Sequence, residues 1–369
     1  MRVAIDSGPL SSGHSVRGIG AHTKELIKSL KLETDDSNIK IDAFDFQKEG
    51  TRLDKEKYDV IHFTVFNPFF ISIPLVKPKN TKFILTIHDL IPLIYPEHYK
   101  PGVRGKLKFL VNKLLIKKNV DAVVTISETS KKDICRFLGV NPKKVYVNYL
   151  APRAIFNNIP SHLNESYKLP DKFVLYVGDV NYNKNIPVLI KACKIAKVPL
   201  VIVGKQALDI EDRGIDLRTL NGPMDFARYL FGKPHPELAH YDDLLNEFRN
   251  NKKIIRLGFV ADHDLAVIYK MATVYCQPSL YEGFGLPVLE AFAAGTPVVA
   301  SKTQSLVEIA EGGALFSDPR DPNDFAEKIE EITNDKVLRD KLIKKGLDIA
   351  KNFSWKKTAK QTLEIYAKV

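Results

Sequence analysis

Cysteine is scarce in this chain of 369 residues: Cys135, Cys193 and Cys276 are the only three, and they stand far apart. An odd and dispersed set argues against a disulfide framework and indicates buried free thiols in a reducing compartment. Long apolar runs are also lacking. The run that comes closest to a membrane span, 68–76, is broken by prolines. It is also shorter than the roughly 20 residues of a membrane-spanning helix.

Residues 1–6 already have the composition of a strand, which leaves no room for a signal peptide, so we expect a cytoplasmic protein. Features of nucleic-acid binding are missing too: we find no arginine-rich arm, zinc-ligand spacing or RNP-like aromatic motif. The net charge is nevertheless +11, from 55 Lys and Arg against 44 Asp and Glu. This surplus suits an acidic ligand or an anionic membrane, and we expect no nucleic-acid partner.

Short apolar runs alternate with amphipathic stretches along the chain. The runs are rich in Val, Ile and Phe, as is typical of parallel strands buried on both faces. In the first half they fall at 2–6, 40–44, 60–63, 83–87, 122–126 and 145–149. Helical patterns lie between several of them, at 22–30 and at 130–138. In the second helix Ser130 and Asp133 can form a capping box, and Gly139 can end it.

The alternation lapses at 151–171 and then restarts, which indicates two α/β domains in series. We place them at 1–165 and 166–354. The later strands are predicted at 173–177, 200–203, 254–259, 274–277, 297–300 and 314–316, and the helices at 186–197, 262–271, 287–294 and 322–333. The connection 205–251 is long for one loop, so we expect a helix near 241–249 and a surface excursion before it.

The segment 279–290 is the most suggestive of a ligand, because it joins a predicted strand to a helix that Pro287 begins. Glycines let its backbone turn tightly, and the amides at the helix N-terminus can form an anion site. Glu282 stands in the loop and Glu290 in the opening turns of the helix. The alternative to a ligand role is that Glu282 is a solvated loop charge and Glu290 a helix-dipole partner. The amides in question are those of Phe284, Gly285 and Leu286.

The pattern of Glu282 and Glu290 with seven residues between them closely resembles the signature of family-4 retaining glycosyltransferases, which have the GT-B fold. The flanking segments 258–260, 277–279 and 294–299 are also similar to that family. The resemblance implies two Rossmann-like domains whose parallel sheets face an interdomain cleft. It further implies that the last helix, 355–369, crosses back to complete the first domain.

The resemblance also assigns roles at the donor. Glu282 contacts hydroxyls of the donor sugar near C3, and Glu290 grips the ribose of the nucleotide. The loop amides hold the diphosphate. The donor-binding set that it implies in this domain is Asn183, Val260, Gly283, Phe284, Gly285, Leu286 and Glu290.

A second loop, 178–185, leaves a predicted strand before a helix and carries Lys184. A lysine there can neutralise a phosphate as a point charge, although without further context an ordinary exposed lysine is the simpler explanation. In the resembling family this loop supplies a Lys and an Arg to the leaving diphosphate. Lys184 matches the Lys, but the Arg is missing, because Asn183 stands where many relatives have it.

Further candidates lie in the first domain. Gly18 and Gly20, between the first strand and the first helix, fit a close approach to a phosphate, although a short Gly-x-Gly is weak evidence. His88 and Asp89 end a strand at the same face, where such a pair is most often an ordinary strand-end contact. By resemblance, Gly20 lies against the diphosphate or the acceptor, and His88 approaches the sugar from the acceptor side with Asp89 nearby.

The stretch 100–118 has Leu and Val at helical spacing, with lysines around them. The ordinary explanation is a surface helix whose apolar face covers the core. The alternative is a helix that lies on anionic lipid. That alternative would suit a lipid-linked acceptor and a protein peripheral to the inner face of the membrane.

The resemblance therefore predicts a retaining hexosyltransferase of polysaccharide biosynthesis, with a mannose or glucose type of sugar favoured. It would use an NDP-sugar donor and a saccharide or lipid-linked acceptor. Glu282, His88 and Lys184 are the expected catalytic residues. We expect no cofactor and no metal, because the loop amides and Lys184 serve the phosphates. The alternatives are a nucleotide-sugar epimerase, a phosphorylase, or a non-catalytic nucleotide-sugar-binding protein on the same scaffold.

Overall fold

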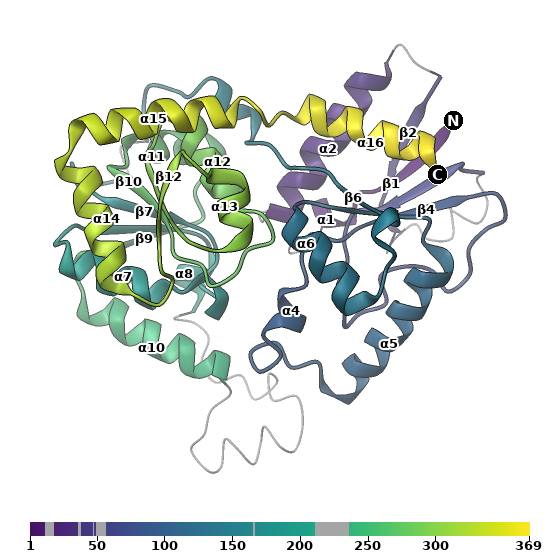
Figure 1. Cartoon of the computed structure of the whole chain (residues 1–369), viewed down its shortest axis with the longest axis horizontal. Helices are drawn as coiled ribbons and strands as arrows, with labels where there is room; N and C mark the ends of the chain where they lie inside the picture. Colours follow the sequence, from purple (N-terminus) through teal and green to yellow (C-terminus); the bar gives the residue numbers. More distant parts are fainter. Residues whose placement is uncertain (12–17, 36–37, 47, 49–56, 165–166, 211–235) are drawn as a thin grey trace. The chain divides into compact units, whose positions relative to one another are not determined.

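The computed structural model describes the whole chain except residues 12–17, 36–37, 47, 49–56, 165–166 and 211–235 (Figure 1). The described residues form two compact units. The first consists of residues 1–94, 101–151 and 353–369, and the second of residues 95–100 and 152–352. Each unit is built around its own parallel sheet, as the strand-helix alternation predicted.

The first unit contains a six-stranded parallel sheet with the order β2-β1-β3-β4-β5-β6. Its strands are β1 (Arg2–Asp6), β2 (Lys40–Phe44), β3 (Val60–Phe63), β4 (Lys82–Thr86), β5 (Ala122–Thr125) and β6 (Val145–Val147). The inner strands β3 and β5 are buried along their whole length. This burial on both faces explains why they read as continuous apolar runs.

Helices cover both faces of this sheet. One face packs on Leu115, Ile116, Ile134 and Leu138, which come from α5 and η1. The helical segments among the described residues of the unit are α1 (Gly8–Ser11), α2 (Gly18–Thr34), α4 (Ile91–Ile94), α5 (Gly102–Asn119), α6 (Glu128–Asp133), the π-helix η1 (Ile134–Leu138), the 3-10 helix η2 (Pro142–Lys144) and α16 (Trp355–Lys368).

The start of α6 differs from the prediction. Ser127, not Ser130, caps the helix: the Ser127 side chain accepts a hydrogen bond from the backbone N–H of Ser130. Ser130 Oγ instead donates to the backbone oxygen of His88 at 2.8 Å. The capping-box pattern pointed to the wrong serine because a tertiary partner already engages Ser130. Gly139 does end the segment, with φ of 66° in the left-handed region that favours glycine.

The last helix of the chain belongs to the first unit, where α16 packs against α2 (Figure 1). Asn148, just after β6, donates to the Thr358 backbone oxygen at 3.0 Å and to Thr362 Oγ1 at 2.8 Å. In the sheet, His62 contacts Tyr366 Oη at 2.7 Å through Nδ1 and Thr86 Oγ1 at 2.7 Å through Nε2. Buried polar contacts therefore fix the helix at one position on the sheet.

His62 should make the protein sensitive to mild acid. Burial, with a smaller contribution from the charge of His88, lowers the pKa of His62 from 6.5 to about 3. Between these two values the unfolded chain binds a proton that the folded chain does not, so stability falls as the pH falls. We expect His62 to account for a loss of about 1.4 kcal/mol in the free energy of unfolding between pH 7.5 and pH 5.5.

Urea unfolding at these two pH values tests this prediction. The variant His62→Gln should lose less stability than the wild type over the interval. The matched control is His263→Gln, because the His263 side chain is 57% exposed in the folded chain. An equal loss in the wild type and His62→Gln would contradict the prediction.

The second unit contains another six-stranded parallel sheet, with the order β12-β11-β10-β7-β8-β9. Its strands are β7 (Val174–Val177), β8 (Leu200–Val203), β9 (Ile254–Gly258), β10 (Val274–Gln277), β11 (Val298–Ser301) and β12 (Ala314–Ser317). The chain runs from β7 outward to β8 and β9, and then returns to place β10 on the other side of β7. The strand order therefore reverses between β7 and β10, and such a point is where ligands of doubly wound sheets bind.

Helices cover both faces of the second sheet as well. One face packs on apolar residues of α7, α10 and α14, whereas Tyr275 on the other face contacts Tyr269 of α11. The segments are η3 (Ala154–Asn157), η4 (Tyr182–Lys184), α7 (Ile186–Ile195), α8 (Gln206–Asp209), α10 (Pro236–Asn250), α11 (Asp262–Met271), α12 (Leu286–Ala293), α13 (Gln304–Ala310), α14 (Pro322–Asn334) and α15 (Lys336–Ala350). The surface excursion predicted before α10 lies largely outside the described residues.

The long segment of the second unit begins at residue 152, before the boundary after residue 165 that the composition suggested. The reason is visible in η3 and the residue before it. The Phe156 ring is buried and lies 5.4 Å from the Tyr269 ring of α11, and Arg153 pairs with Glu290 of α12. These contacts attach the start of the apparent linker to the second unit.

Candidate functional site

Glu282 lies in the loop after β10, and neighbouring donors surround its carboxylate. Oε1 accepts hydrogen bonds from Lys184 Nζ at 2.7 Å, Gln277 Nε2 at 2.8 Å and Ser279 Oγ at 2.6 Å. Oε2 accepts from Lys184 Nζ at 2.8 Å. The Glu282 side chain is 9% exposed and that of Lys184 is 21% exposed. The structure thus brings together two of the three predicted catalytic residues as a largely buried ion pair.

This ion pair lies where the strand order of the second sheet reverses. Lys184 ends the short helix η4 after β7, and Glu282 follows β10, the neighbour of β7 in the sheet. Both side chains therefore come from loops at the carboxyl ends of adjacent parallel strands. A ligand that binds beyond these strand ends, as ligands of open α/β sheets do, would meet Lys184 and Glu282 together.

The loop that follows Glu282 turns sharply into α12. Gly285 has φ of 118° and is the N-cap of the helix. A Cβ atom at Gly285 would lie 2.6 Å from Leu306 Cδ2 and 2.9 Å from Ile309 Cδ1, so the position requires glycine. Ser305 Oγ holds the turn by donating to the Glu282 backbone oxygen at 2.7 Å. The predicted anion-binding amides of Phe284, Gly285 and Leu286 therefore lie immediately before α12 and at its first residue.

Glu290, the second glutamate of the pattern, pairs with an arginine that the sequence did not single out. Arg153 Nε donates to Glu290 Oε1 at 2.6 Å, and Arg153 Nη2 donates to Oε2 at 2.9 Å. This is a bidentate arrangement, and the Glu290 side chain is only 3% exposed. Arg153 Nη1 also contacts Asp262 of α11. Burial lowers the pKa of Arg153, but the charge and hydrogen bonds of Glu290 outweigh it and leave the pKa above its ordinary value.

Buried tyrosines surround the two carboxylates. Burial, followed by the negative charge of Glu282, raises the pKa of Tyr176 well above its ordinary value, and burial followed by Glu290 does the same for Tyr269. Both phenols therefore remain protonated at neutral pH. Tyr269 Oη lies 3.4 Å from Glu290 Oε2, and Tyr176 Oη donates to the Asp179 backbone oxygen at 2.6 Å. The two carboxylates thus have protonated phenols nearby in addition to their charged partners.

Two other predicted donor-binding residues of this unit have structural contacts. The Asn183 amide is buried and engaged at both ends: Oδ1 accepts from Tyr99 Oη at 2.9 Å and Nδ2 donates to the Tyr281 backbone oxygen at 3.3 Å. Val260 is buried in the connection between β9 and α11. Asn183 therefore fixes the loop that carries Lys184, which is a role the sequence did not reveal.

The predicted residues of the first unit lie at two places. His88 and Asp89 follow β4, and Asp89 Oδ1 accepts from the Ile91 backbone N–H at 3.1 Å at the start of α4. Gly18 and Gly20 lie in the first turn of α2 and not in the loop predicted before it, and neither has a positive φ. Arg17, which precedes them, lies outside the described residues. His88 Nε2 is 2.7 Å from Nδ1 of His22 on α2.

Both halves of the chain match known families of proteins. Residues 162–348 match the family described as Glycosyl transferases group 1, and residues 37–150 match Glycosyltransferase Family 4. This chain belongs to the glycosyl transferases group 1 family. The matched range 162–348 contains Lys184, Glu282 and Glu290.

Known relatives of this glycosyltransferase include mannosyltransferases. O-antigen chain mannosyltransferase B of Escherichia coli is 30% identical over 295 residues, which are 77% of this chain and 69% of that protein. The serotype-specific mannosyltransferase WbdA of Escherichia coli is 26% identical over 308 residues, which are 78% of this chain and 34% of WbdA. The glycosyltransferase described here thus spans about a third of the length of WbdA.

Solved structures share the fold of this chain. HepE from Anabaena, in complex with UDP and glucose, aligns with a TM-score of 0.69 at 17% identity and covers 100% of both chains. Sucrose-phosphate synthase from Thermosynechococcus elongatus aligns with a TM-score of 0.67 at 20% identity and covers 100% of this chain and 98% of that one. The glycosyltransferase therefore has the GT-B fold, as the resemblance implied.

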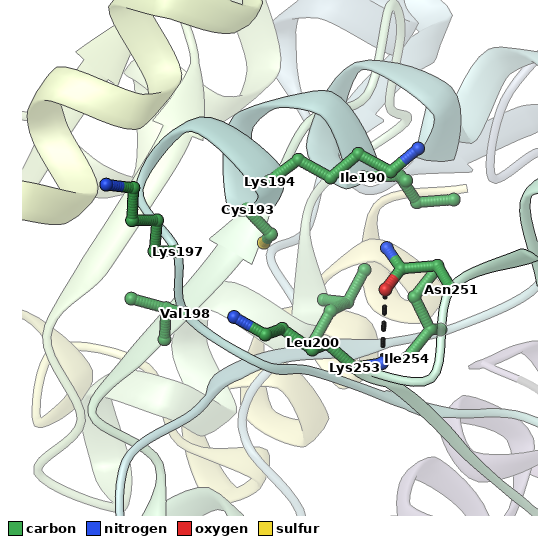
Figure 2. Close-up of a pocket in the computed structure, with 9 residues that line it drawn as sticks. All are labelled: Ile190, Cys193, Lys194, Lys197, Val198, Leu200, Asn251, Lys253 and Ile254. Carbon is green, nitrogen blue, oxygen red and sulfur yellow. Dashed lines mark hydrogen bonds between the residues drawn. The ribbon is translucent and has the colours of Figure 1, made fainter.

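A separate pocket of the glycosyltransferase opens at the opposite edge of the second sheet (Figure 2). Leu200 and Ile254, which line it, are the first residues of β8 and β9, so the pocket lies at the amino ends of the strands. It is thus distant from the ion pair of Lys184 and Glu282 at the carboxyl ends. Its other lining residues are Ile190, Cys193, Lys194, Lys197, Val198, Asn251 and Lys253.

Proposed function

We propose that this glycosyltransferase moves a hexose of the mannose or glucose type from an NDP-sugar to a saccharide or lipid-linked acceptor, with retention of the anomeric configuration. The observation that carries the proposal is the ion pair of Lys184 and Glu282 where the strand order reverses, beside the first turn of α12. The names of the Escherichia coli relatives support mannose as the sugar. The complex of HepE with UDP and glucose supports a nucleotide-linked donor.

The chemical difficulty of the transfer lies in the departing diphosphate. When the bond from the sugar C1 to the diphosphate oxygen breaks, negative charge develops on the leaving group. The amides of Phe284, Gly285 and Leu286 and the ammonium of Lys184 would stabilise that charge, and preorganised donors of this kind contribute several kcal/mol. Lys184 Nζ already donates a hydrogen bond to Glu282 Oε1 at 2.7 Å, so its position would be fixed before the donor binds.

Retention follows if the acceptor attacks from the face that the diphosphate leaves. The acceptor oxygen forms a new bond to C1, and its proton passes to the departing phosphate oxygen, so no protein nucleophile is needed. Retaining hydrolases instead use two carboxylates about 5 Å apart and a covalent intermediate. In our proposal Glu282 positions the sugar hydroxyls and the lysine, and it does not form a covalent bond.

An assay with labelled donors tests the proposed function. The protein is incubated with GDP-mannose or UDP-glucose and a tagged mannose oligosaccharide, and the anomeric configuration of the product is read by NMR. We expect a longer saccharide whose new linkage keeps the configuration of the donor. A product of opposite configuration would exclude retention. Isomerised donor without transfer would favour the epimerase, and binding without any turnover would favour the non-catalytic alternative.

A second part of the proposal concerns the membrane. None of the helices that the structure describes is both long and apolar enough to span a bilayer. α5 covers the core with one face, as the ordinary explanation predicted, but that face does not include all of its apolar residues. Leu115 and Ile116 are buried, but Leu107, Leu110 and Leu114 are exposed, together with Val103. Helical periodicity places these four exposed side chains in one stripe, opposite the face that contacts the core.

Basic residues flank this stripe. α5 contains Arg104, Lys106, Lys108, Lys113, Lys117 and Lys118, and it has no acidic residue. An apolar stripe between rows of long basic side chains is the arrangement of helices that lie on anionic lipid, because the side-chain stems extend along the apolar surface while their charges reach the headgroups. We propose that α5 rests on an anionic bilayer, where a lipid-linked acceptor would be found.

Vesicle sedimentation tests the membrane contact. The protein should sediment with phosphatidylglycerol vesicles at low salt and much less with phosphatidylcholine vesicles or at high salt. The variant Leu107→Gln/Leu110→Gln/Leu114→Gln should bind at least about tenfold more weakly, whereas Val337→Gln, which changes an exposed residue of α15, should bind normally. Equal sedimentation with and without anionic vesicles would exclude the contact.

A further inference from the structure

His22, which the resemblance gave no role, lies in a compact aromatic cluster of the first unit. Its Nδ1 is 2.7 Å from His88 Nε2, and the two rings meet edge to face with centroids 4.8 Å apart. His22 also stacks on Trp355, with centroids 5.9 Å apart and an interplanar angle of 26°. The three residues come from α2, the segment after β4 and the first position of α16, which are distant in the sequence.

A contact of this length between two ring nitrogens is a hydrogen bond, so one nitrogen carries the proton and the other accepts it. A proton on both nitrogens would make them repel, and a proton on neither would leave two lone pairs facing each other. His22 is buried, and burial, followed by the nearby charges of His88 and His62, lowers the pKa of His22 well below its ordinary value. His22 is therefore neutral at pH 7, and its tautomer determines whether His88 Nε2 accepts or donates.

The same contact limits the rotation of the His88 ring. The χ2 angle of a histidine has a broad energy profile, so an unrestrained ring samples many angles. The backbone of His88 is fixed by the hydrogen bond from Ser130 Oγ at 2.8 Å. The bond to His22 then fixes the ring, and the stacking on Trp355 limits the movement of His22 in turn.

We propose that His22 is a positioning residue of the glycosyltransferase: it fixes the ring angle and the tautomer of His88, and Trp355 holds His22 in place. The inference rests on the proposed function in one respect, the approach of His88 to the transferred sugar. When His88 is neutral, the protonation of one of its ring nitrogens determines that of the other. His22 thereby decides whether Nδ1 of His88 donates a hydrogen bond or accepts one.

Two substitutions of His22 separate positioning from packing. His22→Phe keeps an aromatic ring against Trp355 but removes the nitrogen, whereas His22→Asn can place an amide near the position of Nδ1. We expect His22→Phe to lower kcat about tenfold or more, with the donor KM within about twofold of the wild-type value. His22→Asn should recover most of the lost kcat. A purely structural role predicts instead that both variants change activity only in proportion to their loss of stability.

NMR of the histidine side chains provides a readout that does not need activity. Long-range proton–nitrogen correlation spectra distinguish the two tautomers, and a His88→Asn variant assigns the His88 signals. We expect a single His88 tautomer in the wild type and a mixture or the opposite tautomer in His22→Phe. Trp355 is the only tryptophan, so its unchanged emission in His22→Phe would verify that the cluster remains folded.

The outcomes separate this inference from the proposed function. If His88→Asn transfers sugar normally, His88 has no role in transfer and the inference fails, while the glycosyltransferase activity stands. If no donor is used at all, the proposed function fails and the His88 tautomer spectra alone decide on the positioning by His22. Wild-type kcat and unchanged His88 signals in His22→Phe would overturn the inference.

Discussion

The variant Glu282→Gln should fold normally and transfer sugar at least about a hundredfold more slowly than the wild type. Glutamine has nearly the shape of glutamate but no charge. The Glu282 carboxylate accepts hydrogen bonds from Lys184 at 2.7 and 2.8 Å and therefore fixes the ammonium that would meet the diphosphate. The amide would also bind the hydroxyls of the sugar less strongly. The measurement is kcat/KM for the donor at saturating acceptor.

Variants of Lys184, the ion-pair partner of Glu282, show whether the two residues act as a pair. Lys184→Met should also reduce transfer, and it should destabilise the fold because it leaves a largely buried carboxylate without its cation. The double variant Lys184→Met/Glu282→Gln removes both charges, so its stability should return toward that of the wild type while its activity stays low. Glu330→Gln, on the exposed side of α14, is the matched control. Normal turnover by Glu282→Gln would contradict the role given to the pair.

The variant Arg153→Met should lose about 3–5 kcal/mol in the free energy of unfolding. Arg153 holds both oxygens of Glu290, whose side chain is 3% exposed, and without the guanidinium that carboxylate remains buried and uncompensated. Urea unfolding measures the loss. Such a cost is large beside the total stability of about 5–15 kcal/mol that is typical of a protein.

A second substitution shows whether the uncompensated charge is the cause. Arg153→Met/Glu290→Gln has no charge at either position, so it should recover much of the lost stability. It should nevertheless bind the nucleotide weakly, because the proposed ribose contact of Glu290 is gone. The control Arg249→Met changes an exposed arginine of α10 and should cost less than about 0.5 kcal/mol. If Arg153→Met is as stable as this control, the Arg153–Glu290 pair contributes little.

The strands of both sheets could be predicted from the sequence because they are buried on both faces. Runs such as 60–63 and 200–203 contain no charged residue, and each of these two is a strand over that same range. The loop that contains Glu282 was also predictable, since Gly285 must take a positive φ and proline follows at the start of α12. These features depend on local chemistry, which a sequence displays directly.

The partners of the predicted site residues could not be found in this way. Arg153 stands in a segment that looks like a linker, and nothing near it indicates a contact with a residue 137 positions away. His22 occupies an ordinary helical position, 66 residues before His88. Ser130 fits a local capping rule, but its hydroxyl is taken by a tertiary contact. Such pairings depend on how the elements pack, and no local pattern encodes them.

The exposed stripe on α5 could also not be predicted from the sequence alone. Helical spacing identified the apolar residues. Because they lie on two opposite faces of the helix, the pattern does not tell which of the two faces contacts the core. The structure assigns Leu115 to the core and leaves Leu110 exposed. Only that assignment distinguishes a helix that packs on the core from one that also has a surface for a membrane.

Binding of nucleotides is the measurement that tests the central claim most directly. Thermal unfolding is recorded with UDP, GDP, ADP and TDP and with their common sugar conjugates. One base should be clearly favoured, and at a hundredfold excess over its Kd the ligand should stabilise the protein by about 2.7 kcal/mol. Glu290→Gln should lose most of that shift. An unchanged melting temperature with every nucleotide would contradict the donor site that we assign to Lys184, Glu282 and Glu290.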